Sequence, residues 1–174
     1  MSIDTSIPFR DRLERRPAEG ALYDGQIRYL IMRPDALMGM FERLDPPARA
    51  TALEALAASL CAYGGRSVAA YAAANPEDPS ALLEEIAATA ADLGWGSWQI
   101  SRHSEGLDIC VTNSPFAVLP ATGTVCAPIR GILSAFAKSL SDMRVEETCC
   151  RASTGGETCH FTLRPCHSQP NPTV

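Results

Sequence analysis

The segment GWGSWQISRHSEGLDICVT, residues 94–112, decides the kind of fold that this chain can adopt. Apolar and polar residues alternate in two short runs, which is typical of strands with one buried face. Ser104, Glu105 and Gly106 separate the runs, and a short polar connection of this kind favours an antiparallel hairpin. The apolar positions are Trp98 and Ile100 in the first run and Leu107, Ile109 and Val111 in the second.

A helix and a second hairpin are expected after this segment. Residues 128–140 predict the helix, because Ile129, Ile132, Leu133 and Phe136 recur at helical spacing. The runs MRVEETCC (143–150) and TCHFTL (158–163) predict two strands, and Gly155-Gly156 between them predicts their turn.

The preceding half of the chain predicts one strand and a block of helices. Residues 26–33 alternate as a strand does, and Pro34 suits the first turn of a helix. An Ala-rich stretch over 48–74 predicts two helical pieces separated at Gly64-Gly65, and a further helix is expected from Pro79 to about Leu93. The helix expected over 34–44 should bury Leu37, Met40, Phe41 and Leu44. With few parallel crossovers, this order predicts an α+β fold in which helices pack largely on one face of an antiparallel sheet.

Length and composition set the domain organisation and exclude several classes of protein. The 174 residues suffice for one core, so we expect an N-terminal arm over 1–22, a single domain over 23–165 and a disordered tail over 166–174. A net charge of −5 argues against direct nucleic-acid binding. No run approaches the ~18 apolar residues of a membrane span. The N-terminus lacks the apolar run of a secretion signal, so we expect a cytoplasmic protein.

The chain has seven cysteines, a high and odd number for a protein in a reducing compartment. Some of these cysteines are therefore expected to bind a metal and not to form disulfides. Cys126 precedes the last helix, Glu147 and Cys150 lie in one strand of the closing hairpin, and Cys159 lies in the other. Thiolate and carboxylate ligands in fourfold coordination are typical of structural zinc. These four residues are therefore the predicted zinc ligands.

Two other residues compete for places in this site. Cys149 offers a thiol next to Cys150, and His160 would replace Cys159 if that thiol did not bind. Since neighbouring strand residues face opposite sides of a sheet, His160 is expected on the face away from Cys159. Cys61 and Cys110 are expected to be core thiols, and Cys166 lies in the predicted tail.

The segments GWGSWQISRHSEGLDICVTNSPFA, CAPIRGILSAF and VEETCCRASTGGETCHF together resemble the 4-vinyl reductase domain family in order and spacing. The resemblance covers about residues 26–163 and is specific from Gly94 onward. It implies a fold shared with the sensory domains of aromatic-responsive activators, with hydrocarbon-binding proteins and with TRAPP subunits. It also implies that Cys126, Glu147, Cys150 and Cys159 hold zinc beside a buried small molecule, and that the chain forms a homodimer.

The favoured function is a zinc-containing module that binds or senses a small apolar, aromatic or tetrapyrrole-like compound. A bacteriochlorophyll 4-vinyl reductase or its accessory protein is an alternative, although the sequence has no nicotinamide or flavin fingerprint, so we favour a role without catalysis. A TRAPP-like protein–protein adaptor is the other alternative. The candidates for lining a ligand pocket are Trp95, Trp98, Phe116, Tyr63, Tyr71, Phe41 and Met40.

Overall fold

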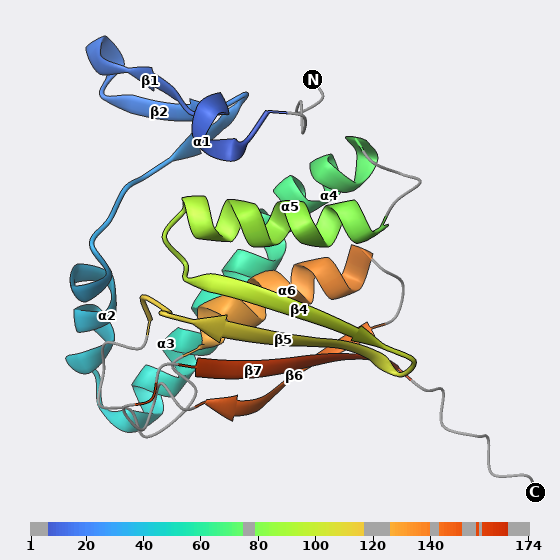
Figure 1. Cartoon of the computed structure of the whole chain (residues 1–174). Helices are drawn as coiled ribbons and strands as arrows, with labels where there is room; N and C mark the ends of the chain where they lie inside the picture. The colour runs from blue at the N-terminus through green and yellow to red at the C-terminus, as the bar shows by residue number, and fades with distance from the viewer. Residues whose placement is uncertain are drawn as a thin grey trace, which may run out of the picture.

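The computed structural model describes residues 7–74, 79–116, 126–139, 143–150, 156 and 158–166. Its centre is a four-stranded antiparallel sheet with the strand order β4-β5-β7-β6 (Figure 1). Both predicted hairpins are confirmed, although most of the predicted turn at Gly155-Gly156 lies outside the described residues. The strands are β4 (Ser97–His103), β5 (Gly106–Thr112), β6 (Met143–Cys150) and β7 (Thr158–Pro165).

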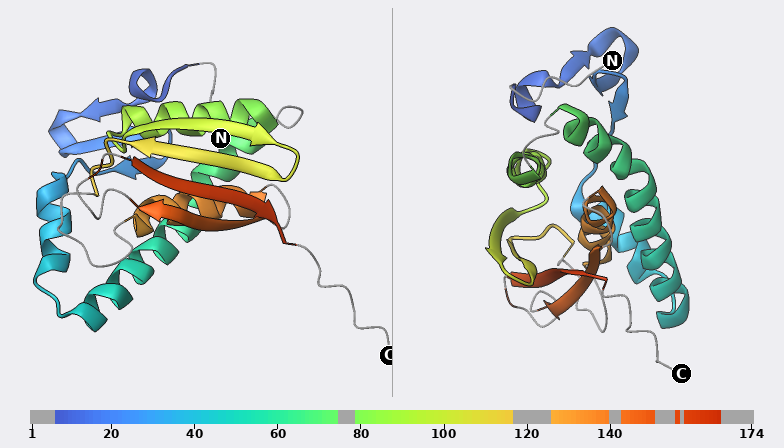
Figure 2. Two further views of the ribbon diagram at one scale, coloured as in Figure 1. Left: turned by 60° about the horizontal axis from the view of Figure 1, so that its bottom comes forward. Right: turned by 90° about the vertical axis from the view of Figure 1, so that its right-hand side faces the viewer.

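Helices cover one face of this sheet in two layers, as the edge-on view of Figure 2 shows. Helix α6 (Ala127–Ser139) lies against the sheet, and α3 (Pro46–Ser59) packs on the other side of α6. Gly131 allows the two helices to approach closely, because a Cβ atom there would lie 2.4 Å from the backbone oxygen of Ala57. The α+β class with helices on one face of an antiparallel sheet is thus confirmed.

The Ala-rich stretch forms one continuous helical segment, whereas a break at Gly64-Gly65 was expected. Helix α3 passes through a π-helical turn, η2 (Leu60–Gly64), directly into α4 (Gly65–Ala74). A Cβ atom at Gly64 would lie 2.4 Å from the Ile132 side chain, so the glycine is explained by contact with α6. The prediction of a break was wrong because this glycine gives room to a neighbouring helix, and both glycines keep helical backbone angles.

Helix α5 (Pro79–Asp92) begins at Pro79 as expected. The Gly94-Trp95-Gly96 sequence turns the chain from α5 into β4. Gly94 and Gly96 have φ angles of 75° and 92°, and a Cβ atom at Gly96 would lie 2.4 Å from the backbone oxygen of Thr112. Both glycines are therefore required by the backbone at this corner.

The N-terminal residues form a small three-stranded sheet, β1-β2-β3, next to α5 (Figure 1). Because this sheet includes residues before and after position 22, it joins the expected arm to the expected domain. Its elements are α1 (Phe9–Arg12), β1 (Glu14–Arg16), the 3₁₀ turn η1 (Pro17–Glu19), β2 (Ala21–Asp24) and β3 (Ile27–Tyr29). Arg12 links this sheet to α5, because its guanidinium pairs with Asp24 of β2 at 3.4 Å and with Glu85 of α5 at 3.3 Å.

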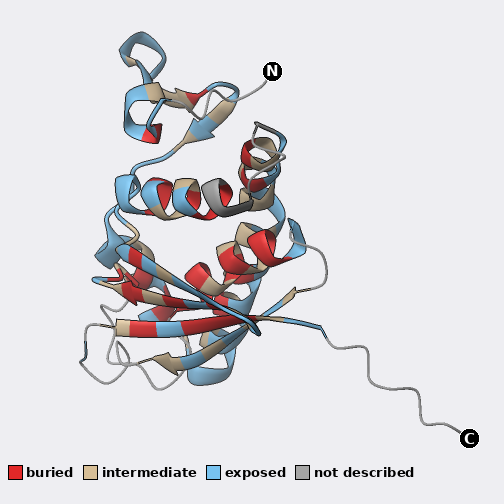
Figure 3. Ribbon diagram, turned by 45° about the vertical axis from the view of Figure 1, so that its right-hand side comes forward, coloured by how far each residue is buried: buried red, intermediate tan, exposed pale blue. Residues whose placement is uncertain are grey.

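The hydrophobic core lies between the sheet and the helices, where the buried residues of Figure 3 gather. Helix α2 (Pro34–Glu42) contributes Met38 and Phe41, whereas Met40 is 52% exposed. The expected buried face included Met40 in place of Met38, and this was wrong because the helix is rotated toward Met38 and Phe41. The largest fully buried side chains include Phe41, Phe136, Phe161, Met38, Ile109, Ile129 and Leu133. Within the described residues, no helix is long and apolar enough to cross a membrane.

Candidate functional site

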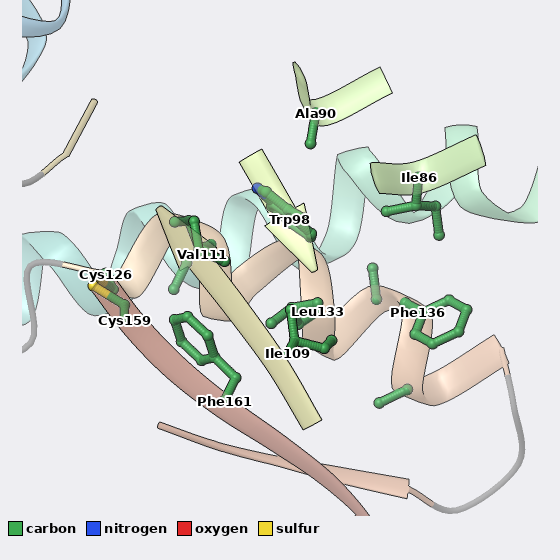
Figure 4. Close-up of a cluster of buried hydrophobic side chains, with 14 of the residues drawn as sticks. Ile86, Ala90, Trp98, Ile109, Val111, Cys126, Leu133, Phe136, Cys159 and Phe161 are labelled. Carbon is green, nitrogen blue, oxygen red and sulfur yellow. Dashed lines mark hydrogen bonds between the residues drawn. The ribbon is translucent and has the colours of Figure 1, made fainter. Parts of the chain in front are cut away.

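The four predicted metal ligands come together at one end of the core. One ligand atom from each of Cys126, Glu147, Cys150 and Cys159 lies within 4.8 Å of the others. The Cys126 sulfur lies 2.9 Å from that of Cys159 and 3.6 Å from that of Cys150, and the last two sulfurs are 3.8 Å apart. Figure 4 shows the sulfurs of Cys126 and Cys159 together beside the apolar cluster. Among the described residues, this is the one group with metal-ligand geometry.

A β-bulge in β6 places two of these ligands on the same face. Residues three apart in a regular strand face opposite sides of the sheet. Here Glu147 pairs with Phe161, Cys149 with His160 and Cys150 with Cys159, so Thr148 is the extra residue. A bulge of this kind redirects the side chains that follow it. Glu147 and Cys150 therefore both point toward the core, where Phe161 and Cys159 are fully buried.

Two features of the site favour a bound cation. Both carboxylate oxygens of Glu147 are buried without a hydrogen-bond partner among the described residues. An unpaired buried carboxylate is costly, and a positive ion offsets that cost. The hydrogen bond with Cys159, burial and the nearby Glu147 raise the pKa of the Cys126 thiol. Because these effects hold the thiol in its protonated form, a cation is needed to stabilise the thiolate.

The residues present fit a tetrahedral zinc ion. Zinc with Zn–S bonds of about 2.3 Å separates two coordinated sulfurs by about 3.8 Å. Two of the three sulfur–sulfur distances are near this value. The third, 2.9 Å between Cys126 and Cys159, would have to increase on zinc binding. Cys126 also stands at the start of α6, where its backbone oxygen accepts from Arg130. The positive end of the helix dipole there favours an anionic ligand.

The other thiols and the nearby histidine do not reach this site. His160 is exposed and lies on the far face of β7 from Cys159, as predicted. Cys149 pairs with His160 on that far face, so the bulge favours Cys150 as the ligand from this strand. Cys61 and Cys110 are half-buried free thiols, and Cys166 is exposed.

An apolar cavity of about 340 Å³ lies between the helices, β4 and the N-terminal sheet. Its wall is formed by α4, α5, the π-turn η2, the start of β4, Ile132 of α6 and residues 27–29 of β3. A volume of this size is within the range of small-molecule sites in proteins. Trp98 donates its indole hydrogen to the backbone oxygen of Trp95 at 3.2 Å, which orients the Trp98 ring at the wall.

Four of the seven predicted pocket residues line this cavity: Trp95, Trp98, Tyr63 and Tyr71. The other three lie elsewhere. Phe116 packs edge-on against Trp95 with ring centroids 5.2 Å apart, Phe41 belongs to the closed core, and Met40 is exposed. Helical and strand periodicity identifies buried aromatic residues, but it does not distinguish a cavity wall from a filled core.

Most polar groups of the cavity come from residues that were not predicted to line it. They are Arg28, Tyr29, Ser67 and Thr89, which join Tyr71 in the wall. Burial raises the pKa of Tyr29 to about 12 and also raises that of Tyr71, so both phenols are neutral at physiological pH. Ser67 and Tyr71 are four residues apart, and one face of α4 carries both. That spacing is the sequence signal that could have identified Ser67.

Comparison with solved structures identifies the architecture. The phenol-responsive sensory domain of the transcription activator PoxR, in a crystal structure with phenol, matches 92% of this chain and 88% of its own length. The TM-score is 0.72 and the sequence identity 16%. This chain shares that sensory-domain fold.

The comparisons with a second solved structure, with family models and with curated proteins do not identify a family. A trafficking protein particle complex subunit 3 from Naegleria fowleri, covalently bound to palmitic acid, matches 75% of this chain and 93% of its own length with 15% identity. Its TM-score of 0.45 is too low to support an argument. No family model matches the sequence, and no curated protein matches it either. The sensory-domain fold is therefore established by structure, while the 4-vinyl reductase resemblance remains an interpretation of the motifs.

Proposed function

We propose that this chain is a cytoplasmic sensing module that binds a small apolar or aromatic molecule in the cavity between α4, α5 and β4. The observation that carries the proposal is the apolar cavity of about 340 Å³, walled by Trp95 and Trp98, in a chain with a sensory-domain fold. A filled core without a cavity would favour a protein–protein adaptor, whereas a cavity of this size suits a module that binds a small molecule. The 4-vinyl reductase resemblance is consistent with this role, and no described feature of the site favours catalysis by a reductase.

The metal in this proposal is zinc, and its role is structural. Three thiolates and one carboxylate supply all four positions of a tetrahedral ion, which leaves none for a reactive water. Zinc would fasten the closing hairpin to the start of α6, and α6 contributes Ile132 to the cavity wall. The site thus stabilises the helix on which one side of the cavity depends.

We also propose that the chain acts as a homodimer. The connection between β3 and α2 carries three consecutive apolar residues that are largely exposed: Leu30, Ile31 and Met32, at 77%, 80% and 51%. Neighbouring exposed apolar residues are typical of protein interfaces. Light scattering on the purified chain tests this directly, and Ile31→Lys should shift a dimer toward monomer.

Isothermal titration calorimetry with a panel of phenols and alkylbenzenes tests the ligand proposal. We expect saturable binding of at least one of these compounds, and Trp98→Ala should weaken it because the indole forms part of the wall. Met40→Ala changes an exposed residue outside the cavity and is the matched control. Absence of binding across the whole panel would contradict a small-molecule role.

A further inference from the structure

The wall of the cavity is built from two parts of the chain. Strand β3 contributes Ile27, Arg28 and Tyr29, and every other lining residue lies between positions 60 and 132. The connection 30–33 joins the two parts, and it is exposed and lies outside any helix or strand. Figure 1 shows this connection running from the N-terminal sheet to α2. The chain itself therefore does not hold β3 against α4 and α5.

The N-terminal sheet and α1 are tied together as one unit. Arg12 of α1 pairs with Asp24 of β2 at 3.4 Å, and the two side chains are 6% and 4% exposed. Phe9 of α1 is buried and packs edge-on against Tyr29 of β3, with ring centroids 5.1 Å apart. Because these contacts lie inside the unit, residues 9–29 can move together without breaking them.

Arg12 also fastens this unit to both neighbouring helices. Its Nη1 atom donates to the Glu85 carboxylate of α5 at 3.3 Å, and its Nη2 atom donates to the Tyr71 hydroxyl of α4 at 3.0 Å. Charge-assisted hydrogen bonds of full strength are about 2.7–2.9 Å long. The contact with Glu85 is longer than that, and the Glu85 side chain is 17% exposed. A contact of this kind can break and form again.

Two further hydrogen bonds cross the same boundary. The Arg10 backbone N–H donates to the Asp92 carboxylate at 3.2 Å in an exposed position, and the Tyr29 hydroxyl is hydrogen-bonded to Ser67. A single hydrogen bond contributes only about 0.5–1.5 kcal/mol, because water replaces it when it breaks. Neither contact therefore prevents the unit from separating from the helices.

The exposed residues of the cavity wall mark its mouth. Tyr63 and Leu93 are 64% and 37% exposed, and Arg28 of β3 is exposed as well. Val68 and Ile86, from the same wall, are only 4% and 6% exposed. Strand β3 thus supplies one rim of the mouth. Movement of this strand away from α4 and α5 would widen the mouth and uncover the buried part of the wall.

We infer that the N-terminal sheet is a hinged cover of the cavity, with the connection 30–33 as its hinge and the contacts of Arg12 with Glu85 and Tyr71 as its latch. The cover opens when these two contacts break, while Arg12 stays paired with Asp24 inside the moving unit. The role of this motion in admitting a small molecule rests on the proposed function. The motion itself does not depend on any ligand.

Thiol labelling of the full chain tests the cover. Val68→Cys places a thiol of similar size on the buried part of the wall, where N-ethylmaleimide reaches it when the mouth widens. In this background, Glu85→Ala should raise the labelling rate at position 68 about tenfold, because one charge-assisted hydrogen bond of the latch is lost. Glu84→Ala changes an exposed neighbour on the same helix and is the matched control, which should leave the rate unchanged.

Two native cysteines provide reference rates in the same peptide mass spectra. Cys166 is exposed and gives the rate of an accessible thiol, whereas Cys159 is fully buried on β7 and reports opening of the main core. Glu85→Ala should raise labelling at position 68 and leave Cys159 unchanged. Equal increases at both positions, or no increase at position 68, would show that the sheet does not open as a separate cover.

Quenching of tryptophan fluorescence by acrylamide measures the same motion without Val68→Cys. The chain has two tryptophans, Trp95 and Trp98, and both line the cavity. Glu85→Ala should increase quenching relative to Glu84→Ala, and equal quenching would contradict the cover. Neither measurement uses a ligand. Failure of the cover therefore leaves the proposed function standing, and failure of the calorimetric titration leaves the cover standing.

Discussion

Glu147 and Cys150 point to the same side of β6 although three positions separate them, because Thr148 is an extra residue in that strand. Cys150 is thereby brought opposite Cys159, and the Glu147 carboxylate reaches the same space. The candidate metal site thus depends on the register of one strand as much as on the identity of the four residues.

This register predicts different results for deletion and insertion at position 148. Deleting Thr148 restores an unbroken ladder, and Glu147 and Cys150 still face the same side because they are then two residues apart. We expect the deletion variant to keep about one metal ion per chain. Inserting a second threonine turns Cys150 toward the opposite face and should reduce the metal content to near zero. Equal metal content in the two variants, measured by mass spectrometry, would contradict this explanation.

Substituting Glu147 by glutamine should have opposite effects with and without metal. The metal-bound protein loses one anionic ligand, so its Tm should fall. After chelation, the variant no longer buries an unpaired carboxylate, so its Tm should exceed that of the unmodified protein under the same conditions. Glu146→Gln, on the exposed face of the same strand, is the control and should change neither Tm by much. Thermal unfolding with and without a chelator measures both effects.

Metal affinity should increase with pH. The hydrogen bond with Cys159 and burial raise the pKa of the Cys126 thiol, so this thiol is protonated in the metal-free protein at neutral pH. Metal binding must displace that proton, and raising the pH makes the displacement easier. Calorimetric titrations in buffers with different ionisation enthalpies should show proton release on binding. Affinity that does not change between pH 6 and pH 8 would argue against coordination by thiolates.

Two glycine-to-alanine substitutions should change stability in opposite directions. Gly131→Ala places a Cβ atom 2.4 Å from the Ala57 backbone oxygen, which forces α6 away from α3. We expect a loss of about 1–3 kcal/mol in the free energy of unfolding. Gly39→Ala, in α2, has nothing within 4 Å of the new Cβ atom, and it should stabilise the protein by about 0.5–1 kcal/mol. Urea denaturation of the metal-loaded protein measures both values. If Gly131→Ala left the free energy of unfolding unchanged, the close contact between α3 and α6 would be contradicted.

Sequence periodicity was sufficient to predict the strands and helices around the site. The alternation in residues 97–112 predicted the β4–β5 hairpin, and helical spacing after Cys126 predicted α6. It failed where a residue serves a tertiary contact. Gly64 is a typical helix breaker, but here it lies in a π-turn that accommodates the Ile132 side chain. In α2, Met38 is buried where Met40 was expected to be.

The four predicted metal ligands lie together in the structure, but the reason that they do so was not visible in the sequence. A period of two would place Glu147 and Cys149 on one face, and only the bulge at Thr148 selects Cys150. The polar residues of the cavity wall were missed for a related reason. Tyr29 and Thr89 are ordinary residues in the sequence, and they line one cavity with Tyr71 only because β3, α4 and α5 come together in the fold.

X-ray absorption spectroscopy at the zinc edge on the purified chain tests whether Cys126, Glu147, Cys150 and Cys159 hold zinc. We expect one zinc ion with three sulfur ligands at about 2.3 Å and one oxygen ligand at about 2.0–2.2 Å. Cys149→Ser should leave this spectrum unchanged, whereas Cys150→Ser should remove one sulfur. A nitrogen ligand from histidine, fewer than three sulfurs in the unmodified chain, or no metal at all would show that these four residues do not form a zinc site.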